Sequence, residues 1–138
     1  MSNNVQYVNP EGACPAQGLY SHLTRVKAGE LIFVSGQLSV GNDGSVVGVG
    51  DFDAQFKQVF ENLRGVLAGV GTDFNDVAKF TTYMVASQHI PSFMRLRAEL
   101  FPSLFKTDMY APNTLLIVDR LVKEEFLIEV EAVVRARD

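Results

Sequence analysis

The stretch that decides the fold is residues 77–118, which read VAKFTTYMVASQHIPSFMRLRAELFPSLFKTDMYAPNTLLIV. Residues 77–85 are rich in β-branched and aromatic side chains and predict a strand. Residues 114–118 form an unbroken apolar run, typical of a strand that is buried on both faces. Between them, Ser87 offers an N-cap for a helix that ends before Pro102 or shortly after it. This order predicts a β-α-β crossover, whose two strands are parallel.

The sequence on either side of this unit adds further strands and another helix. Residues 31–35 predict a strand, followed by a Gly-Asn-Asp-Gly turn at 41–44 and a short strand. Residues 20–26 predict an earlier strand that could pair with 31–35 as a hairpin. Apolar side chains at helical spacing predict a helix from about residue 53 to 68, with aspartates at its start and glycines at its end. The last strand is expected at 126–134.

These elements predict one domain with one core. The order is three strands, a helix, a strand, a helix and two strands, which is typical of an α+β or α/β sandwich with both helices on one face of a mixed sheet. The chain has 138 residues and a mass of 15.2 kDa, and 47% of its residues are hydrophobic. This length suffices for a core without disulfides. We therefore expect a single domain over residues 1–138.

The second face of the sheet predicts contact with another chain. In the strand at 77–85 both sets of alternating side chains are apolar, with Phe80 and Met84 on one side and Tyr83 and Val85 on the other. Two helices cover one face of a sheet, so the other face must be covered by something else. A second copy of the chain is the simplest cover, and we expect a homo-oligomer.

Composition argues against several classes of protein. The net charge of −4 repels phosphate backbones, which disfavours nucleic-acid binding. No apolar run approaches the roughly 20 residues of a membrane span, and residues 1–4 show no feature of a secretory leader. The single cysteine, Cys14, cannot form an internal disulfide. We expect a soluble, cytoplasmic protein with no membrane association.

The last strand carries the strongest candidate for chemistry. Residues 128–132 read IEVEA, so Glu129 and Glu131 share one face and the apolar residues share the other. If the apolar set packs on the helices, both carboxylates point to the face that meets the second copy. Partial desolvation there would raise the pKa of a glutamate and suit it to general acid/base work. The alternative is an edge strand with two solvated glutamates; Glu131 could also be held by a cation.

Other polar residues give less specific signals. Ser35 and Gly36 follow an apolar strand and could bind a small polar ligand, or simply form a turn. Cys14 has no paired histidine nearby and is interpreted as a surface or packed thiol. His22 and His89 have no companion at metal-binding spacing, which disfavours a metal site. Three arginines are interpreted as solvated charges: Arg95, Arg97 and Arg120.

Several segments together resemble a known family. They are GLY at 18–20, FVSGQ at 33–37, the helix pattern from Ala54 through Gln58 and Asn62 to Gly71, RL at 120–121 and IEVEA at 128–132. In this order and spacing they resemble the RidA/YjgF reactive-intermediate deaminases over almost the whole chain. The resemblance implies a chorismate-mutase-like fold and a homotrimer, in which three sheets form a central barrel with the helices outside.

The resemblance also implies a function and a site. Members of the family hydrolyse reactive enamines and imines to carbonyl compounds and ammonia, without a metal or bound cofactor, in clefts between subunits. By position, Tyr20, Ser35 and Gly36 would line the cleft. Glu129 would hold or activate the water that attacks the imine carbon.

One departure from the family pattern bears on the substrate. Deaminating members carry Pro-Ala-Arg-Ser before the penultimate strand, where the arginine grips the substrate carboxylate, whereas this chain reads APNT at 111–114. Asn113 therefore stands in place of the arginine, with Thr114 beside it, and carries no charge. The cleft cysteine of the family falls at Leu115 and a helix asparagine at Met94. The resemblance thus implies a cleft with an altered substrate range, fitted to a less anionic ligand or to none.

Three functions follow from these observations. The first is hydrolysis of enamines or imines with Glu129 as the acid/base. The second is a non-catalytic homotrimer that binds small metabolites in the same clefts. The third is the endoribonuclease or translation-inhibitor activity attributed to some relatives, which the acidic net charge disfavours.

Overall fold

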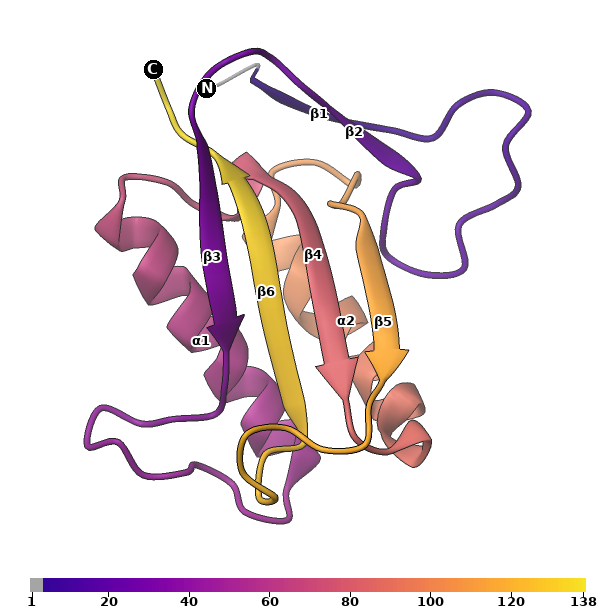
Figure 1. The fold of residues 1–138 in the computed structure, drawn as a ribbon. Helices are drawn as coiled ribbons and strands as arrows, with labels where there is room; N and C mark the ends of the chain where they lie inside the picture. The colour runs from indigo at the N-terminus through magenta and orange to yellow at the C-terminus, as the bar shows by residue number, and fades with distance from the viewer. Residues whose placement is uncertain (1–3) are drawn as a thin grey trace.

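The computed structural model describes residues 4–138, which form two sheets and two α-helices (Figure 1). The main sheet has four strands in the order β3-β6-β4-β5. In chain order, these strands are β3 (Leu31–Gln37), β4 (Val77–Met84), β5 (Asn113–Ile117) and β6 (Ile128–Arg135). β6 pairs antiparallel with β3 and with β4, whereas β4 and β5 are parallel. The predicted mixed sheet with a β-α-β crossover is confirmed.

Both helices lie against one face of the main sheet, behind the strands in the view of Figure 1. They are α1 (Phe52–Gly69) and α2 (Ile90–Leu104). Asp51 caps α1 by accepting a hydrogen bond from the N–H of Ala54 at 3.1 Å. The prediction of Ser87 as an N-cap is wrong: it opens a 3₁₀ turn, η2 (Ser87–His89), that runs into α2 without a side-chain cap.

A layer of aromatic rings fills the space between helices and sheet. The rings come from α1, α2, β4 and the turn after α1, and neighbouring centroids lie about 5–6 Å apart, in the range of favourable aromatic pairs. They are Phe56, Phe60, Phe74, Phe80, Phe93 and Phe101, each at most 4% exposed. The strand side chains that meet them are Ile128, Val130, Ala132 and Val134 of β6, all buried. The expectation that this set faces the helices is confirmed.

The strand near residue 24 has a different partner from the one expected. β2 (Leu23–Val26) pairs with β1 (Val5–Val8) in a separate two-stranded sheet, and not with β3. In the turn that follows β2, Arg135 donates to the carbonyls of Lys27 and Ala28 at 2.9 and 2.8 Å. Lys27 and Ala28 are thereby held against the guanidinium group, and β2 and β3 do not pair as a hairpin.

Two further expectations about strands are corrected. The turn at 41–44 leads to a single bridge between Val40 and Val46 and not to a strand. β5 is an edge strand in this chain, with Leu116 42% exposed and Ile117 45% exposed, so it is not buried on both faces. The apolar run was correctly identified as a strand, but its outer face remains uncovered.

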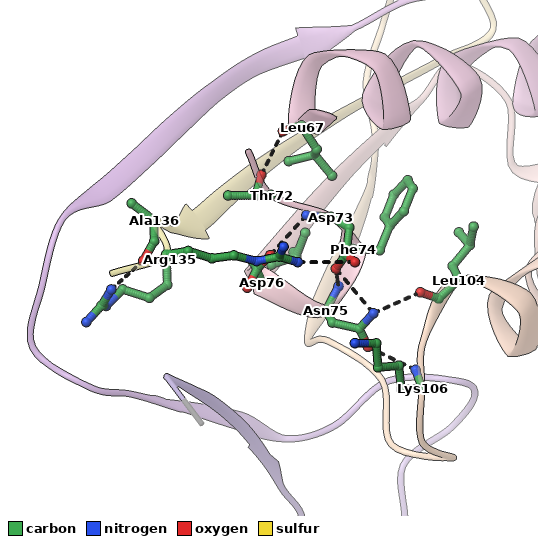
Figure 2. A network of polar contacts seen from close by, with 12 residues as sticks. Leu67, Thr72, Asp73, Phe74, Asn75, Asp76, Leu104, Lys106, Arg135 and Ala136 are labelled. Atoms are coloured by element: carbon green, nitrogen blue, oxygen red, sulfur yellow. Dashed lines mark hydrogen bonds and ion pairs between the residues drawn. The ribbon is translucent and has the colours of Figure 1, made fainter. Parts of the chain in front are cut away.

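A polar network around the turn after α1 fixes the end of the sheet against α2 (Figure 2). This turn is η1 (Phe74–Asp76), and Asp73 and Asp76 close it reciprocally through side-chain bonds to backbone N–H groups. The carboxylate of Asp76, which is buried, also pairs with Arg137 at 2.9 Å. Asn75 donates to the carbonyl of Leu104 and accepts from the N–H of Lys106 (Figure 2). The network therefore ties α2 to the start of β4.

One buried amide holds the loop before β6. Gln55 is 0% exposed, donates to the carbonyls of Gly48 and Glu125 and accepts from the N–H of Leu127 at 2.8 Å. Gln55→Leu would leave these backbone groups unpaired, at about 1–3 kcal/mol each. We expect unfolding free energy to fall by about 3 kcal/mol and the melting temperature by about 6–12 °C. Calorimetry with the exposed Gln88→Leu as control tests this, and equal effects of both variants would contradict it.

Candidate active site

The face of the main sheet that the helices leave uncovered, here called the open face, carries the predicted carboxylates. Strand register places Glu129 opposite Tyr83 and Glu131 opposite Thr81, and Phe33 lies opposite Val133 on the same face. Phe33 is 76% exposed, the largest exposure among the exposed large hydrophobic residues of the described chain. The open face thus combines apolar side chains with two carboxylates. The alternative of an edge strand with solvated glutamates is wrong, because β6 lies between β3 and β4.

Glu129 lies over Gly36 of the neighbouring strand. A Cβ atom on Gly36 would come within 2.1 Å of Oε2 of Glu129, so any larger residue would displace the carboxylate. The strand pairing shifts between Val34 and Gln37, and Gly36 lies in this irregular segment. Burial raises the pKa of Glu129, and the nearby negative charge of Glu131 raises it further. The predicted direction of the pKa shift is confirmed.

This shift predicts how Glu129 affects stability as the pH changes. A carboxyl with a raised pKa in the folded state contributes stability that is fully present below its unfolded pKa of about 4.3 and is lost as pH rises through the folded pKa. Glu129→Gln removes this pH dependence. We therefore expect Glu129→Gln to melt above the wild type at pH 8, with a difference that shrinks toward pH 4. Thermal melts across this range test it, and a difference that grows toward pH 4 would contradict it.

Glu131 has a partner within the chain. The hydroxyl of Tyr83 donates a short hydrogen bond to Oε1 of Glu131, and this bond raises the pKa of Tyr83. The partner is thus a phenol, and among residues 4–138 no cation forms an ion pair with Glu131. Glu131 is held by its neighbour, whereas Glu129 has no such bond within the described residues.

Another set of predicted residues lines a hollow at the opposite edge of the sheet. This α2–β5 hollow has a volume of about 280 Å³ and is walled by α2, β5 and the segment before β2. It contains four of the residues proposed from the sequence: Tyr20, Met94, Asn113 and Leu115. Asn113 accepts a hydrogen bond from Oγ1 of Thr82 at 2.7 Å, which occupies its carbonyl oxygen, and the residue lines the hollow. Thr114 points to the open face instead, since its register partner is Thr81.

The hollow also contains a residue that sequence reasoning missed. Arg97 was interpreted as a solvated charge, but it is 3% exposed and lines the hollow. A signal was present in the sequence, since Ile90, Phe93, Arg97 and Phe101 follow helical spacing on one face of α2. Arg95 and Arg120 fit the interpretation, because both are about half exposed and pair with acidic residues at the surface.

Within one chain the predicted site residues fall into two separate groups. Ser35, Gly36 and Glu129 belong to β3 and β6 on the open face, whereas Asn113 and Leu115 belong to β5 and face α2. Only β4 lies between β6 and β5, which corresponds to roughly 10 Å at the usual strand spacing, but Glu129 and the hollow residues lie on opposite faces of the sheet. A small ligand bound in the hollow therefore does not touch Glu129 of the same chain.

Comparison with known proteins identifies the family. Residues 11–136 match the family described as endoribonuclease L-PSP, to which the RidA and YjgF proteins belong. The chain belongs to this family. It is 31% identical to a RutC family protein of Pyrococcus horikoshii, over 89% of this chain and 91% of that protein. It is 30% identical to the 3-aminoacrylate deaminase RutC of Acinetobacter baylyi, over 93% and 95% of the two chains.

Solved structures of the RidA family confirm the fold. The crystal structure of YyfB from Yersinia pestis, a protein of the conserved Rid family, superposes with a TM-score of 0.84 at 30% identity, covering 96% of this chain and 98% of that one. The YjgF gene product of Escherichia coli superposes with a TM-score of 0.69 at 26% identity. The predicted RidA-type α+β fold is thus correct.

The remaining polar features lie apart from these RidA-family site residues. A hollow of about 560 Å³ lies between β1, η1 and the loop after α2, and the Asp76–Arg137 pair lines it. Cys14 is exposed, and His89 stacks on Phe52 at 4.9 Å. Among residues 4–138 no three His, Cys, Asp or Glu side chains gather as a metal site. In the same range neither helix has the length and apolar character needed to cross a bilayer.

Proposed function

We propose that this protein hydrolyses reactive enamine or imine intermediates, releasing ammonia and a carbonyl product, with Glu129 as the acid/base and no metal or cofactor. The observation that carries the proposal is the position of Glu129, whose carboxylate lies over Gly36 with a raised pKa and no partner within the described residues. A carboxyl with a pKa raised toward neutral can both take and return a proton. The 3-aminoacrylate deaminase RutC, 30% identical, supports the reaction class.

The proposed reaction needs two proton transfers at one carboxylate. The imine reacts in its protonated form: Glu129 accepts a proton from water as the water oxygen bonds to the iminium carbon and the C=N π pair moves to nitrogen, which gives a neutral carbinolamine. Glu129 then donates a proton to the carbinolamine nitrogen, the C–N bond breaks, and the hydroxyl proton is lost as the carbonyl forms. The net change is imine plus water to carbonyl compound plus ammonia. An enamine reaches the same path after protonation on carbon.

The working unit is proposed to be a homotrimer with sites shared between subunits. Two observations support this arrangement. The open face leaves Phe33 76% exposed and Leu31 44% exposed, which a second copy would cover. Glu129 lies on the open face of the inner strand β6, whereas the α2–β5 hollow lies on the helix side of the edge strand β5, so in this arrangement the hollow of one subunit would meet Glu129 of the next. Ser35, Gly36 and Thr114 would line the shared cleft from the open face.

Ammonia release tests the proposed reaction. Imines are generated in situ by an amino-acid oxidase from substrates with charged and neutral side chains, and ammonia is measured with and without the protein. We expect acceleration with at least one imine and a substrate range that differs from that of members with arginine in place of Asn113. A rate equal to the uncatalysed one with every imine would overturn the proposal.

The second candidate is a non-catalytic trimer that binds small metabolites. The observation in its favour is that Met94 and Leu115 line the α2–β5 hollow, at positions where the family resemblance implies polar residues. This candidate predicts ligand binding in the hollow with no dependence of any rate on Glu129. The endoribonuclease function is not supported by charge, because the net charge is −4.

A further inference from the structure

Arg97 is a charged side chain in the interior of the protein. It is 3% exposed, and its guanidinium carbon lies 5.0 Å from the centre of the Phe93 ring and 5.9 Å from that of Tyr20. Gly18 lies against it so closely that a Cβ atom there would be 2.5 Å from Nη2. The aromatic faces favour a cation, but they also exclude the water that would otherwise solvate it.

The guanidinium group has no anionic partner in the part of the chain that the structure describes. Its Nε–H is buried without a hydrogen-bond acceptor, and Nη2 contacts Sδ of Met94 at 3.2 Å, which is a weak acceptor. Burial lowers the pKa of Arg97, yet an arginine keeps its charge at neutral pH. An unpaired buried charge opposes folding. We therefore expect a partner that another molecule supplies.

Arg135 shows what a structural buried arginine looks like in the same protein. It is also 3% exposed, but it donates to the carbonyls of Lys27, Ala28 and Ala136 and pairs with Asp138 at 3.2 Å. Its donors are therefore used within the chain, and its contact with Ala136 is visible in Figure 2. Arg97 has the same burial without these acceptors. The difference indicates that the donors of Arg97 serve a molecule that the chain does not supply.

Arg97 lines the α2–β5 hollow, where another side-chain donor is present and acidic residues are not. Asn113 lines the same hollow, and its carbonyl oxygen is occupied by Thr82, so its NH₂ group is the part available to a ligand. Among the described residues that line the hollow there is no aspartate or glutamate. A volume of about 280 Å³ admits a small metabolite. The hollow is thus built to accept an anion.

We propose that Arg97 holds the carboxylate of a small ligand in the α2–β5 hollow, with the NH₂ group of Asn113 as an additional donor. The planar guanidinium matches a carboxylate with paired hydrogen bonds. This inference rests on the proposed function for the reacting end of the ligand. The proposal assigns the positive charge that binds the ligand to position 97 and not to position 113. A ligand with a carboxylate can therefore bind even though Asn113 replaces the arginine of the family. Arg97 is then the residue that sets specificity for carboxylates.

Binding of a product-like acid tests the assignment without any need for turnover. NMR titrations use 2-oxobutyrate and its uncharged amide, 2-oxobutanamide, with the wild type, Arg97→Met and Arg95→Met. Arg95 is the matched control, because it lies on the same helix, half exposed, and pairs with Asp53 and Glu99. We expect 2-oxobutyrate to bind the wild type and Arg95→Met alike and Arg97→Met about ten- to hundredfold more weakly. The amide should bind all three alike, and 2-oxobutyrate should shift the Arg97 Nε–H resonance.

Melting temperatures and oligomer mass separate a binding role from a structural one. We expect ligand-free Arg97→Met to melt at or above the wild-type temperature, because the substitution removes an unpaired buried charge. Equal affinity of the wild type and Arg97→Met for 2-oxobutyrate, including no binding to either, would overturn the inference. So would a loss of oligomer mass in Arg97→Met, which would assign the missing anion to a second copy of the chain. These readouts are independent of ammonia release, so the proposed hydrolysis can stand or fall separately.

Discussion

Glu129→Gln is expected to lower the rate of ammonia release by about 10²–10⁴-fold, the usual contribution of a general acid/base. The glutamine side chain has nearly the same shape and stays over Gly36, so binding in the cleft should change little. What it cannot do is accept a proton from the attacking water or return one to the leaving nitrogen. We therefore expect the loss in kcat, with a small change in KM, in steady-state assays on one confirmed imine.

Glu131→Gln is the matched control for this experiment. Glu131 lies two residues away on the same face, but its carboxylate is held by the hydroxyl of Tyr83. Removing its charge weakens that hydrogen bond, so we expect a lower melting temperature with most of the activity retained. If Glu131→Gln abolishes ammonia release while Glu129→Gln retains it, the acid/base role belongs to the other carboxylate. Unchanged rates in both variants would favour a site that does not use this face.

The main sheet could be predicted because each of its elements carries its own periodicity. The parallel pairing of β4 with β5 followed from the helix between them, and the buried face of β6 followed from alternation in IEVEA. The pairing of β2 with β1 could not be predicted in the same way. The turn after β2 is bound by Arg135, more than a hundred residues away, which donates to the carbonyls of Lys27 and Ala28. Contacts of this kind leave no local pattern.

The individual residues of the candidate site could be predicted from the sequence, but their positions relative to one another could not. Resemblance to a family indicated Tyr20, Ser35 and Glu129, yet it did not indicate that one chain holds Ser35 and Glu129 on the open face and Tyr20 at the α2–β5 hollow. Arg97 was missed because a charged residue in a sequence is normally exposed. Arg97 lies on the apolar face of α2. Helical periodicity therefore indicated that it is buried, whereas its charge alone suggested that it is exposed.

Phe33→Glu is expected to convert the proposed trimer to a monomer at micromolar concentration. Burying a phenylalanine side chain contributes about 1.5–3 kcal/mol per subunit, and a glutamate at the same place adds an unpaired charge to the interface. The chain itself should still fold, because Phe33 is 76% exposed and is not part of the buried core. Val122→Glu is the matched control, since Val122 is 72% exposed but lies in the loop between β5 and β6. Light scattering measures the mass of all three proteins.

Loss of the trimer should also abolish ammonia release, because the α2–β5 hollow and Glu129 then have no partner. Mixed trimers provide the sharper version of this test. Glu129→Gln subunits and Asn113→Trp subunits, in which the hollow is filled, should each be inactive alone. Refolded together in equal amounts, they should regain about a quarter of the wild-type rate, since each site then draws its two halves at random from different subunits. A wild type that is monomeric, or a mixture without recovered activity, would mean that Glu129 and the hollow do not act on one ligand.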